Sequence, residues 1–264
     1  MITPLYGQLS PLRIPTSIPL DSDALAYIAA VESADGATLE DSVKSAINSF
    51  VKGCKEDGIW TPISTSCILA GARTLSGALV PLVGTSPTNN NFVSADYNRK
   101  TGLISNGSTK RLASVNNNTL SQNSNHIYIR ITGEDTRTVS AGIMGTTQLQ
   151  TGSTMLRRSG STAFQASAMS SSGAVYAGTN IKWSNGCGIT RTSSSQVSWM
   201  ENSVARTAAL TSQTPRNETI FVIASGGNYT TSRAAFFSVG QNLNLALLDS
   251  RVSTLMTDLS AAIP

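Results

Sequence analysis

Few residues of this chain have the types and the spacing that catalysis requires. The sequence contains one histidine, His126, and three cysteines that form no CxxC pair. One histidine cannot supply a cluster of histidine metal ligands, and its place beside a predicted strand favours a structural role over one in a Ser-His-Asp system. Clustered Asp and Asn ligands typical of a calcium site are also not apparent in the sequence. We therefore expect no metal site and no cofactor.

The carboxylates of the strand-rich region are poorly spaced for glycoside hydrolysis. Between residues 96 and 240 the chain offers Asp96, Glu134, Asp135, Glu201 and Glu218. Most glycosidases need two carboxyl groups that flank the scissile bond, whereas neighbours in a strand, such as Glu134 and Asp135, point to opposite faces. The expectation from the sequence is that the protein is not an enzyme.

Carbohydrate binding is a chemistry that the remaining side chains could support. An aromatic ring can stack on a sugar while nearby amide and guanidinium groups bond its hydroxyls, and Trp183, Tyr176 and Tyr229 lie near polar loops that contain such groups. The alternative is that these large rings fill the core or contact another subunit, as aromatic side chains usually do. Both interpretations remain open from the sequence.

The composition around these residues is that of a turn-rich β-protein. Only 13% of the 264 residues are charged, and the net charge is +4, whereas about a quarter of residues are charged in an average domain. The basic residues are scattered, without the dense stripe typical of a nucleic-acid surface, so we expect no nucleic acid. No run of eighteen apolar residues predicts a membrane span. The cysteines are expected to be buried free thiols.

Residues 89–264 alternate short apolar runs with turns rich in Gly, Asn and Ser. NHIYIRITG (125–133) and QVSW (196–199) alternate clearly enough to give one buried face. Runs at this spacing predict a β-sandwich domain. The closing segment predicts a last strand, a turn at Gly240 and a helix with an apolar stripe: Leu245, Leu248, Val252, Leu255 and Leu259. Either the chain itself or a second subunit must cover this stripe.

The first twenty residues predict an extended arm. They contain four prolines and one charged residue, so a helix is excluded and polyproline-like geometry is favoured. The apolar side chains need a partner, which we expect to be a docking site on another subunit: Leu9, Leu12, Ile14, Ile18 and Leu20. Residues 1–20 are therefore interpreted as a docking arm.

Residues 21–88 predict a helical hairpin and a connector. A first helix follows Asp21 and ends near Gly36, and a second is expected to begin with a capping box at Thr38 and Asp41 and to end at Gly53. Prolines and glycines interrupt the segment that follows too often for a long helix. We interpret that segment as a connector of short packed turns.

The order of these pieces resembles one known family. GLISNGSTK (102–110), NHIYIRIT, GITRTSSSQVSWMENSV and AFFSVGQNLNLALL, with Gly240, Leu243 and Leu248 in the last segment, are similar to concanavalin A-like, laminin-G-like jelly rolls of bacteriophage virion proteins. The helical hairpin and connector resemble the segment that precedes this sandwich in such proteins, so the likeness covers roughly residues 21–262. Glu201 and Asn202 stand where the family often has Asn-Gly, which predicts a different turn.

The resemblance implies a structural protein of a phage virion, assembled in the host cytoplasm. We expect a short tail fibre or receptor-binding subunit, in which the arm and helices attach to other virion proteins of the capsid or tail. The sandwich would then face a host surface polysaccharide, within a homotrimer. A capsid decoration or cement protein and a free carbohydrate-binding module are the alternatives. A long fibre is disfavoured because no repeats or heptads are present.

Overall fold

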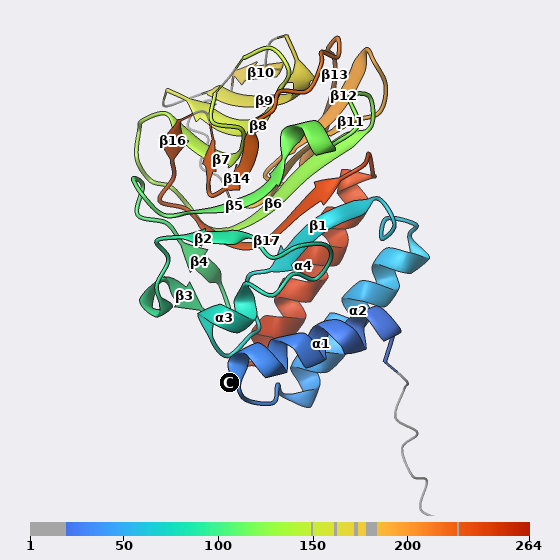
Figure 1. Ribbon diagram of the computed structural model, residues 1–264, viewed down its shortest axis with the longest axis vertical. Coiled ribbons are helices and arrows are strands. Elements are labelled where there is room, and N and C mark those ends of the chain that lie inside the picture. Colours follow the sequence, from blue (N-terminus) through green and yellow to red (C-terminus); the bar gives the residue numbers. More distant parts are fainter. Residues whose placement is uncertain (1–19, 149, 161–162, 172–173, 178–183, 226) are drawn as a thin grey trace, which may run out of the picture.

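Two β-sheets face each other in this protein, and helices cover the outer side of one of them (Figure 1). The computed structural model describes residues 20–264 except 149, 161–162, 172–173, 178–183 and 226, and it describes only the backbone of residues 174–177. The fold is mainly β and forms a jelly-roll-like sandwich, as the sequence predicts. The expected arm at residues 1–20 lies outside the described residues, apart from Leu20.

The sheet beneath the helices, here called sheet A, is antiparallel. Its strands run in the order β13 (Val204–Ala209), β12 (Gln196–Glu201), β11 (Asn185–Arg191), β6 (Asn125–Gly133), β17 (Arg233–Gly240), β4 (Gly102–Ile104) and β3 (Tyr97–Asn98), and β1 (Ile63–Ile68) also pairs with β17. The long strands β6 and β17 lie at the centre because their alternating apolar residues can be buried on both faces.

The second sheet, here called sheet B, lies farther from the helices. Its order is β10 (Ala174–Ala177), β9 (Ala163–Ser170), β8 (Ser153–Ser159), β7 (Ala141–Gly145), β14 (Thr219–Val222), β5 (Arg111–Asn116) and β2 (Thr88–Asn90). A small hairpin of β15 (Ala224–Ser225) and β16 (Asn228–Tyr229) adds to β7. Short 3-10 turns occupy Ser94–Asp96 and Asn117–Thr119. The apolar core between the two sheets includes Phe164 and Trp199, whose stacked rings lie 5.4 Å apart.

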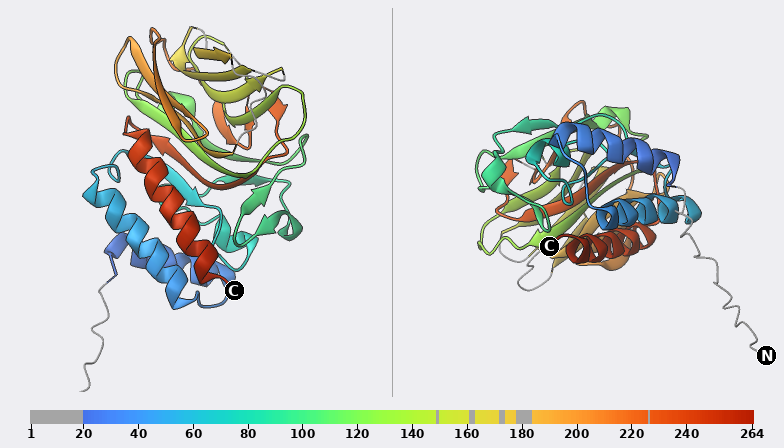
Figure 2. Two further views of the ribbon diagram at one scale, coloured as in Figure 1. Left: turned by 180° about the vertical axis from the view of Figure 1, so that it is seen from behind. Right: turned by 90° about the horizontal axis from the view of Figure 1, so that it is seen from below.

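Helices α1 (Ser22–Asp35), α2 (Asp41–Glu56) and α4 (Leu245–Ala262) share a second core with sheet A, and α3 (Leu75–Ala78) is a single turn. Figure 2 shows α2 and α4 side by side across the sheet. Phe50 of α2 meets Phe236 of β17 at 5.6 Å between ring centroids. All five residues of the predicted stripe on α4 are buried. The chain itself therefore covers this stripe, which settles the alternative that the sequence left open.

The ends of α2 differ from the prediction for tertiary reasons. No side chain caps its first turn, because the carboxylate of Glu40 at the cap position binds Arg99 instead. The helix also continues through Gly53 to Glu56. A Cβ atom at Gly53 would overlap the guanidinium of Arg251 on α4, so this glycine allows two helices to approach closely rather than ending one.

The segment expected as a connector supplies strand β1 to sheet A. Successive side chains of β1 point into different cores, since Ile68 faces the helices and Cys67 faces the inside of the sandwich. Cys54, Cys67 and Cys187 are buried and free, as predicted. The division into domains at residues 20 and 88 stays a prediction. Among the helices of the described chain, none is long and apolar enough to cross a membrane.

Candidate functional site

A groove of about 680 Å³ opens on the outer face of sheet A, beside the N-terminus of α4. We call it the hydroxyl groove, because hydroxyl and amide side chains are frequent among the residues that line it. These residues are Thr190, Thr192, Ser198, Trp199, Ala205, Arg206, Thr207, Asn242, Leu243, Asn244, Leu245 and Ala246. They come from β11 and the residue after it, from β12 and β13, from the turn between β17 and α4, and from the first turn of α4.

Strand register places the hydroxyl groups in one row. Thr190 of β11 lies opposite Ser198 of β12, and Ser198 lies opposite Thr207 of β13. Residues directly opposite in an antiparallel sheet share a face, and the next residue along each strand points to the other face. Trp199 accordingly stacks on Phe164 inside the sandwich. The floor of the groove therefore carries small hydroxyl side chains, and the Trp199 ring belongs to the core.

Part of this polar surface holds the groove together. The hydroxyl of Thr190 donates to the carbonyl of Asn125 and accepts from the backbone N–H of Leu243, both at 3.3 Å. Asn244 caps α4 by accepting from the N–H groups of Ala246 and Leu247. In the described part of the chain, the side chains of Thr192, Ser198, Thr207 and Asn242 have no hydrogen-bond partner. These four groups are available to a ligand.

His126 lies at the covered end of the same row, opposite Thr190. Its Nδ1 contacts the carbonyl of Gln241, and its Nε2 lies 2.8 Å from Oγ of Ser238. A carbonyl can only accept, so Nδ1 carries the proton and Nε2 accepts from Ser238. Complete burial lowers the pKa of His126 to about 4. The neutral imidazole therefore anchors the turn that forms one wall of the groove.

The predicted glycan-binding aromatics do not meet in the hydroxyl groove as far as the structure describes them. Trp183 and the side chain of Tyr176 lie outside the described residues. Tyr229 lies on β16 of sheet B and is half-buried. The guanidinium of Arg111 is 5.7 Å from the Tyr229 ring and 3.8 Å from the ring of Phe221. The enclosed space beside these rings is about 10 Å³, too small for a sugar ring.

The predicted docking residues are described only at their last member. Leu9, Leu12, Ile14 and Ile18 lie outside the described residues, and Leu20 is partly buried against the helical core. Leu20 therefore fixes where the arm joins the folded part of the chain.

Asp135 serves as a structural carboxylate. Its oxygens accept from Arg137 at 2.6 Å, from the backbone N–H of Thr231 at 3.0 Å and from the Thr230 hydroxyl at 3.0 Å. Burial would raise the pKa of Asp135, but these hydrogen bonds outweigh burial and hold the pKa below its usual range. Asp135 thus joins two loops of the sandwich.

Glu201, at the end of β12, is also buried in the described part of the sandwich. It is 7% exposed, and burial raises its pKa. Nowhere in the described chain do three His, Cys, Asp or Glu side chains group as metal ligands would.

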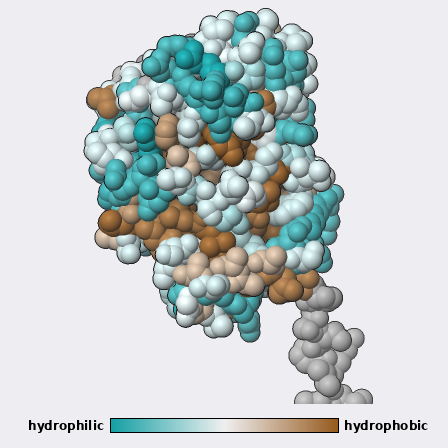
Figure 3. Space-filling model, viewed as in Figure 1, coloured by the Kyte–Doolittle hydropathy of each residue, from teal (hydrophilic) through white to brown (hydrophobic). Residues whose placement is uncertain are grey.

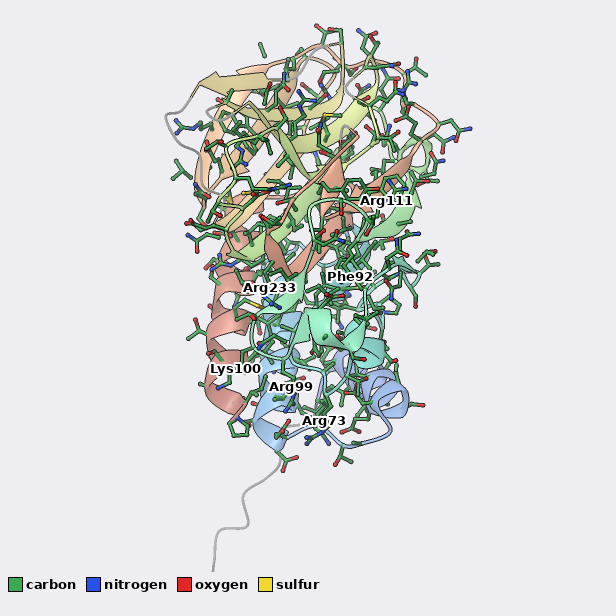
Figure 4. All side chains as sticks on the ribbon, turned by 90° about the vertical axis from the view of Figure 1, so that its left-hand side faces the viewer. Arg73, Phe92, Arg99, Lys100, Arg111 and Arg233 are labelled. Carbon is green, nitrogen blue, oxygen red and sulfur yellow. The ribbon has the colours of Figure 1, made fainter. Side chains whose placement is uncertain are left out.

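Several basic residues on one side of the molecule are engaged within the chain (Figure 4). Arg99 pairs with Glu40 at 2.8 Å, and Arg73 pairs with the same carboxylate at 3.2 Å. The hydrogen bond from Arg99 lowers the pKa of Glu40 to about 2. Arg233 donates to the carbonyl of Gly102 at 2.6 Å. These side chains tie loops of the sandwich edge to each other and to the helices.

Comparison with known proteins places the chain by fold alone. No family model and no curated protein matches the sequence. A mutant of Trypanosoma rangeli sialidase displaying trans-sialidase activity is similar at a TM-score of 0.48 and 11% identity, over 80% of this chain and 39% of that one. The binding domain of botulinum neurotoxin serotype D is similar at 0.49 and 12%, over 72% and 51%. A K499G mutant of NanB sialidase from Streptococcus pneumoniae is similar at 0.37 and 10%, over 53% and 27%.

The expectation that the protein is not an enzyme does not stand, since sialidases are among the solved structures to which the chain is similar. The expectation rested on carboxylates that are adjacent in one strand. Strand β6 ends at Gly133, so Glu134 and Asp135 lie in the loop that follows, and the rule for neighbours in a strand does not apply to them. The chain spans about two fifths of the Trypanosoma rangeli sialidase. The jelly-roll-like β-sandwich is given by the two facing sheets of the chain itself.

Proposed function

We propose that the protein is a structural subunit of a bacteriophage virion whose sandwich binds a host surface polysaccharide through the hydroxyl groove. The arm and the helices attach this subunit to the particle. One observation carries the binding role: side chains of Ser198, Thr207 and Asn242 lie on an open face without partners in the described chain. The virion context rests on the family resemblance of the sequence segments.

The chemistry of the groove suits a polyhydroxylated ligand. Hydroxyl and amide groups both donate and accept hydrogen bonds, as sugar hydroxyls do. Ligand sites usually measure about 300–1,000 Å³, and the groove holds about 680 Å³. Ala205 and Leu243 supply apolar surface between the polar groups for the C–H faces of a sugar. A neutral or weakly charged glycan fits this lining best.

The layout of the molecule supports an outward-facing sandwich. Leu20, where the arm joins, packs on the helical core, and the sandwich extends away from it (Figure 1). The hydroxyl groove lies at the N-terminus of α4, whereas the C-terminus of α4 lies near the loop between α1 and α2. Attachment through the arm and the helices would leave the groove accessible.

The test is a binding screen of the full chain against host surface polysaccharides, followed by calorimetry on the best binder. We expect Thr207→Val combined with Ser198→Ala to weaken binding at least tenfold, since two hydrogen-bonding groups are lost. Ser260→Ala removes an exposed hydroxyl at the far end of α4 and should bind like the parent chain. Release of free sugar is followed in the same samples, so that hydrolysis would be detected.

Three results would contradict the proposal. Unchanged affinity in the double variant would remove the groove from the binding site. Failure to bind any polysaccharide, with the subunit found on the head of purified particles by electron microscopy of labelled protein, would favour a capsid decoration role. Absence of the subunit from particles would exclude the virion role itself.

A further inference from the structure

A second groove, of about 380 Å³, lies between α1 and the chain near Pro81. We call it the α1 groove. Most of the residues that line it have apolar side chains, with Ala26 and Ala30 of α1 on one side and Trp60, Pro81 and Val83 on the other. Asp23 is the one charged residue among those that line it.

The surface of α1 beside this groove is unusual for a helix in water. Leu25 is 54% exposed, and Ala26, Ala29, Ala30 and Ala34 are exposed as well. A solvent-facing helix normally presents charged or polar side chains on its outer face. Figure 3 shows apolar surface that continues from α1 to the segments above it. Apolar areas on the surface of a folded chain are often the sites at which partners bind.

Residues 1–19 have the composition that this surface requires. They contain one charged residue, Arg13, and in extended form they would reach about 60 Å at about 3.1 Å per residue. The fourteen residues of α1 span only about 21 Å at 1.5 Å per residue. The arm is therefore long enough to leave its own subunit and to cover an α1 groove elsewhere.

The entry point of the arm argues against docking on its own α1. Leu20 lines a different groove, which is formed with α2 and contains Asp41, Lys44, Lys52 and Glu56. To reach its own α1 groove from Leu20, the arm would have to turn back around the N-terminus of α1.

We propose that the N-terminal arm of one copy docks in the α1 groove of a second copy. Asp21 and Asp23 share Lys55 at 2.6 and 2.7 Å, which leaves one negative charge beside the groove. Arg13 of the incoming arm complements that charge. The inference rests on the docking role proposed for the arm, whereas glycan binding in the hydroxyl groove does not depend on it. A contact of this head-to-tail kind closes into a ring when the rotation between copies allows.

Sedimentation velocity of the full chain tests the proposal directly. We expect an oligomer for the full chain and a monomer after removal of residues 1–19. Ala30→Arg places a charged side chain in the α1 groove and should also give monomers. Ser45→Arg, on α2 and lining the other groove, is the matched control and should leave the oligomer intact. Thermal unfolding by circular dichroism checks that each variant is folded.

A second measurement keeps the outcome decisive if a variant is poorly folded. A labelled peptide of residues 1–19 should bind the shortened chain in fluorescence anisotropy, and an Arg13→Glu peptide should bind at least tenfold more weakly. A monomeric full chain, an oligomer that survives loss of the arm, or disruption by Ser45→Arg instead of Ala30→Arg would each overturn the proposal. Glycan binding is measured on the same variants and should not change, because the hydroxyl groove does not depend on the arm. Failure of the docking proposal is thereby distinguished from failure of the proposed glycan binding.

Discussion

The outer face of sheet A has two halves that differ in chemistry although they belong to one sheet. On β6 and β17 the face carries Tyr128 and Phe236, which are fully buried beneath α2 and α4. On β12 and β13 the same face carries Ser198 and Thr207, which no helix covers. The side chains change from aromatic to hydroxyl close to the point where α4 begins, at Leu245.

The two halves separate residues that stabilise the fold from residues that stay exposed to solvent. Burial of apolar area is stabilising at about 25 cal/mol per Å², so the covered half contributes to folding in proportion to its contact with the helices. Hydroxyl groups on an open face gain little from folding, because water satisfies them equally well. We expect substitutions in the covered half to cost stability and substitutions in the open half to cost binding.

The largest effect is expected for Leu248→Asp in the covered half. Leu248 is 0% exposed, whereas Leu247, the next residue on α4, is 38% exposed. A buried carboxylate without a partner, together with the lost leucine side chain, should lower the free energy of unfolding by more than about 4 kcal/mol. Leu247→Asp is the control and should cost less than about 1 kcal/mol. Urea unfolding monitored by circular dichroism measures both, and equal midpoints would refute the division into halves.

A polar anchor in the covered half gives the second prediction. The Tyr128 hydroxyl donates to Oδ1 of Asp249 at 2.6 Å, and Asp249 is 7% exposed. Tyr128→Phe removes a hydrogen bond to a buried charge and should cost about 2 to 3 kcal/mol. A double-mutant cycle with Asp249→Asn should show a coupling energy of at least about 0.5 kcal/mol. Strict additivity of the two substitutions would mean that this contact does not hold α4 on the sheet.

The boundary between the halves can be tested through His126. Its pKa is lowered to about 4 in the folded chain, whereas an unfolded histidine has a pKa of about 6.5. Between these values the unfolded chain binds the proton more readily, so stability is complete above about pH 6.5 and falls as the pH drops toward 4. From pH 7 to pH 5 the loss should be about 2 kcal/mol.

His126→Gln supplies the control for the pH measurement. His126 is the one histidine of the chain, so the variant should lose most of the pH dependence between 7 and 5. Chemical unfolding of both proteins at several pH values measures it. A parent chain with equal stability at pH 7 and pH 5 would show that the imidazole is not held neutral beneath the turn at Gln241.

Much of this fold follows from local sequence patterns. Strong alternation in NHIYIRITG predicts β6, and the leucine spacing after Gly240 predicts α4. Strand β13 was not expected, because VARTAA is an exposed edge strand with little apolar signal of its own and is ordered by pairing with β12. The prediction that α2 ends at Gly53 is wrong. A glycine is needed there because the guanidinium of Arg251, which is far away in the sequence, packs against it.

The hydroxyl groove could not be predicted from the sequence for a similar reason. Thr190, Ser198 and Thr207 come together only through the register of β11 with β12 and of β12 with β13. A single sequence shows alternation but not register, so the shared face stays hidden. The sequence predicts aromatic residues near loops as the ligand contacts instead, and the one whose side chain is described, Tyr229, packs beside Arg111 on sheet B.

The smallest effect on stability is expected in the open half, and it is the most informative. Thr207→Val and Ser198→Ala should each change the free energy of unfolding by less than about 0.5 kcal/mol, because neither hydroxyl has a partner in the described chain. Thr190→Val is the matched control in the same row. Its hydroxyl bonds Asn125 and Leu243 under the turn, so its loss should cost about 1 to 2 kcal/mol. Thermal unfolding measures these losses of stability. If Thr207→Val lowered the stability as much as Thr190→Val, the hydroxyl groups of the open half would be structural and would not be available to a ligand.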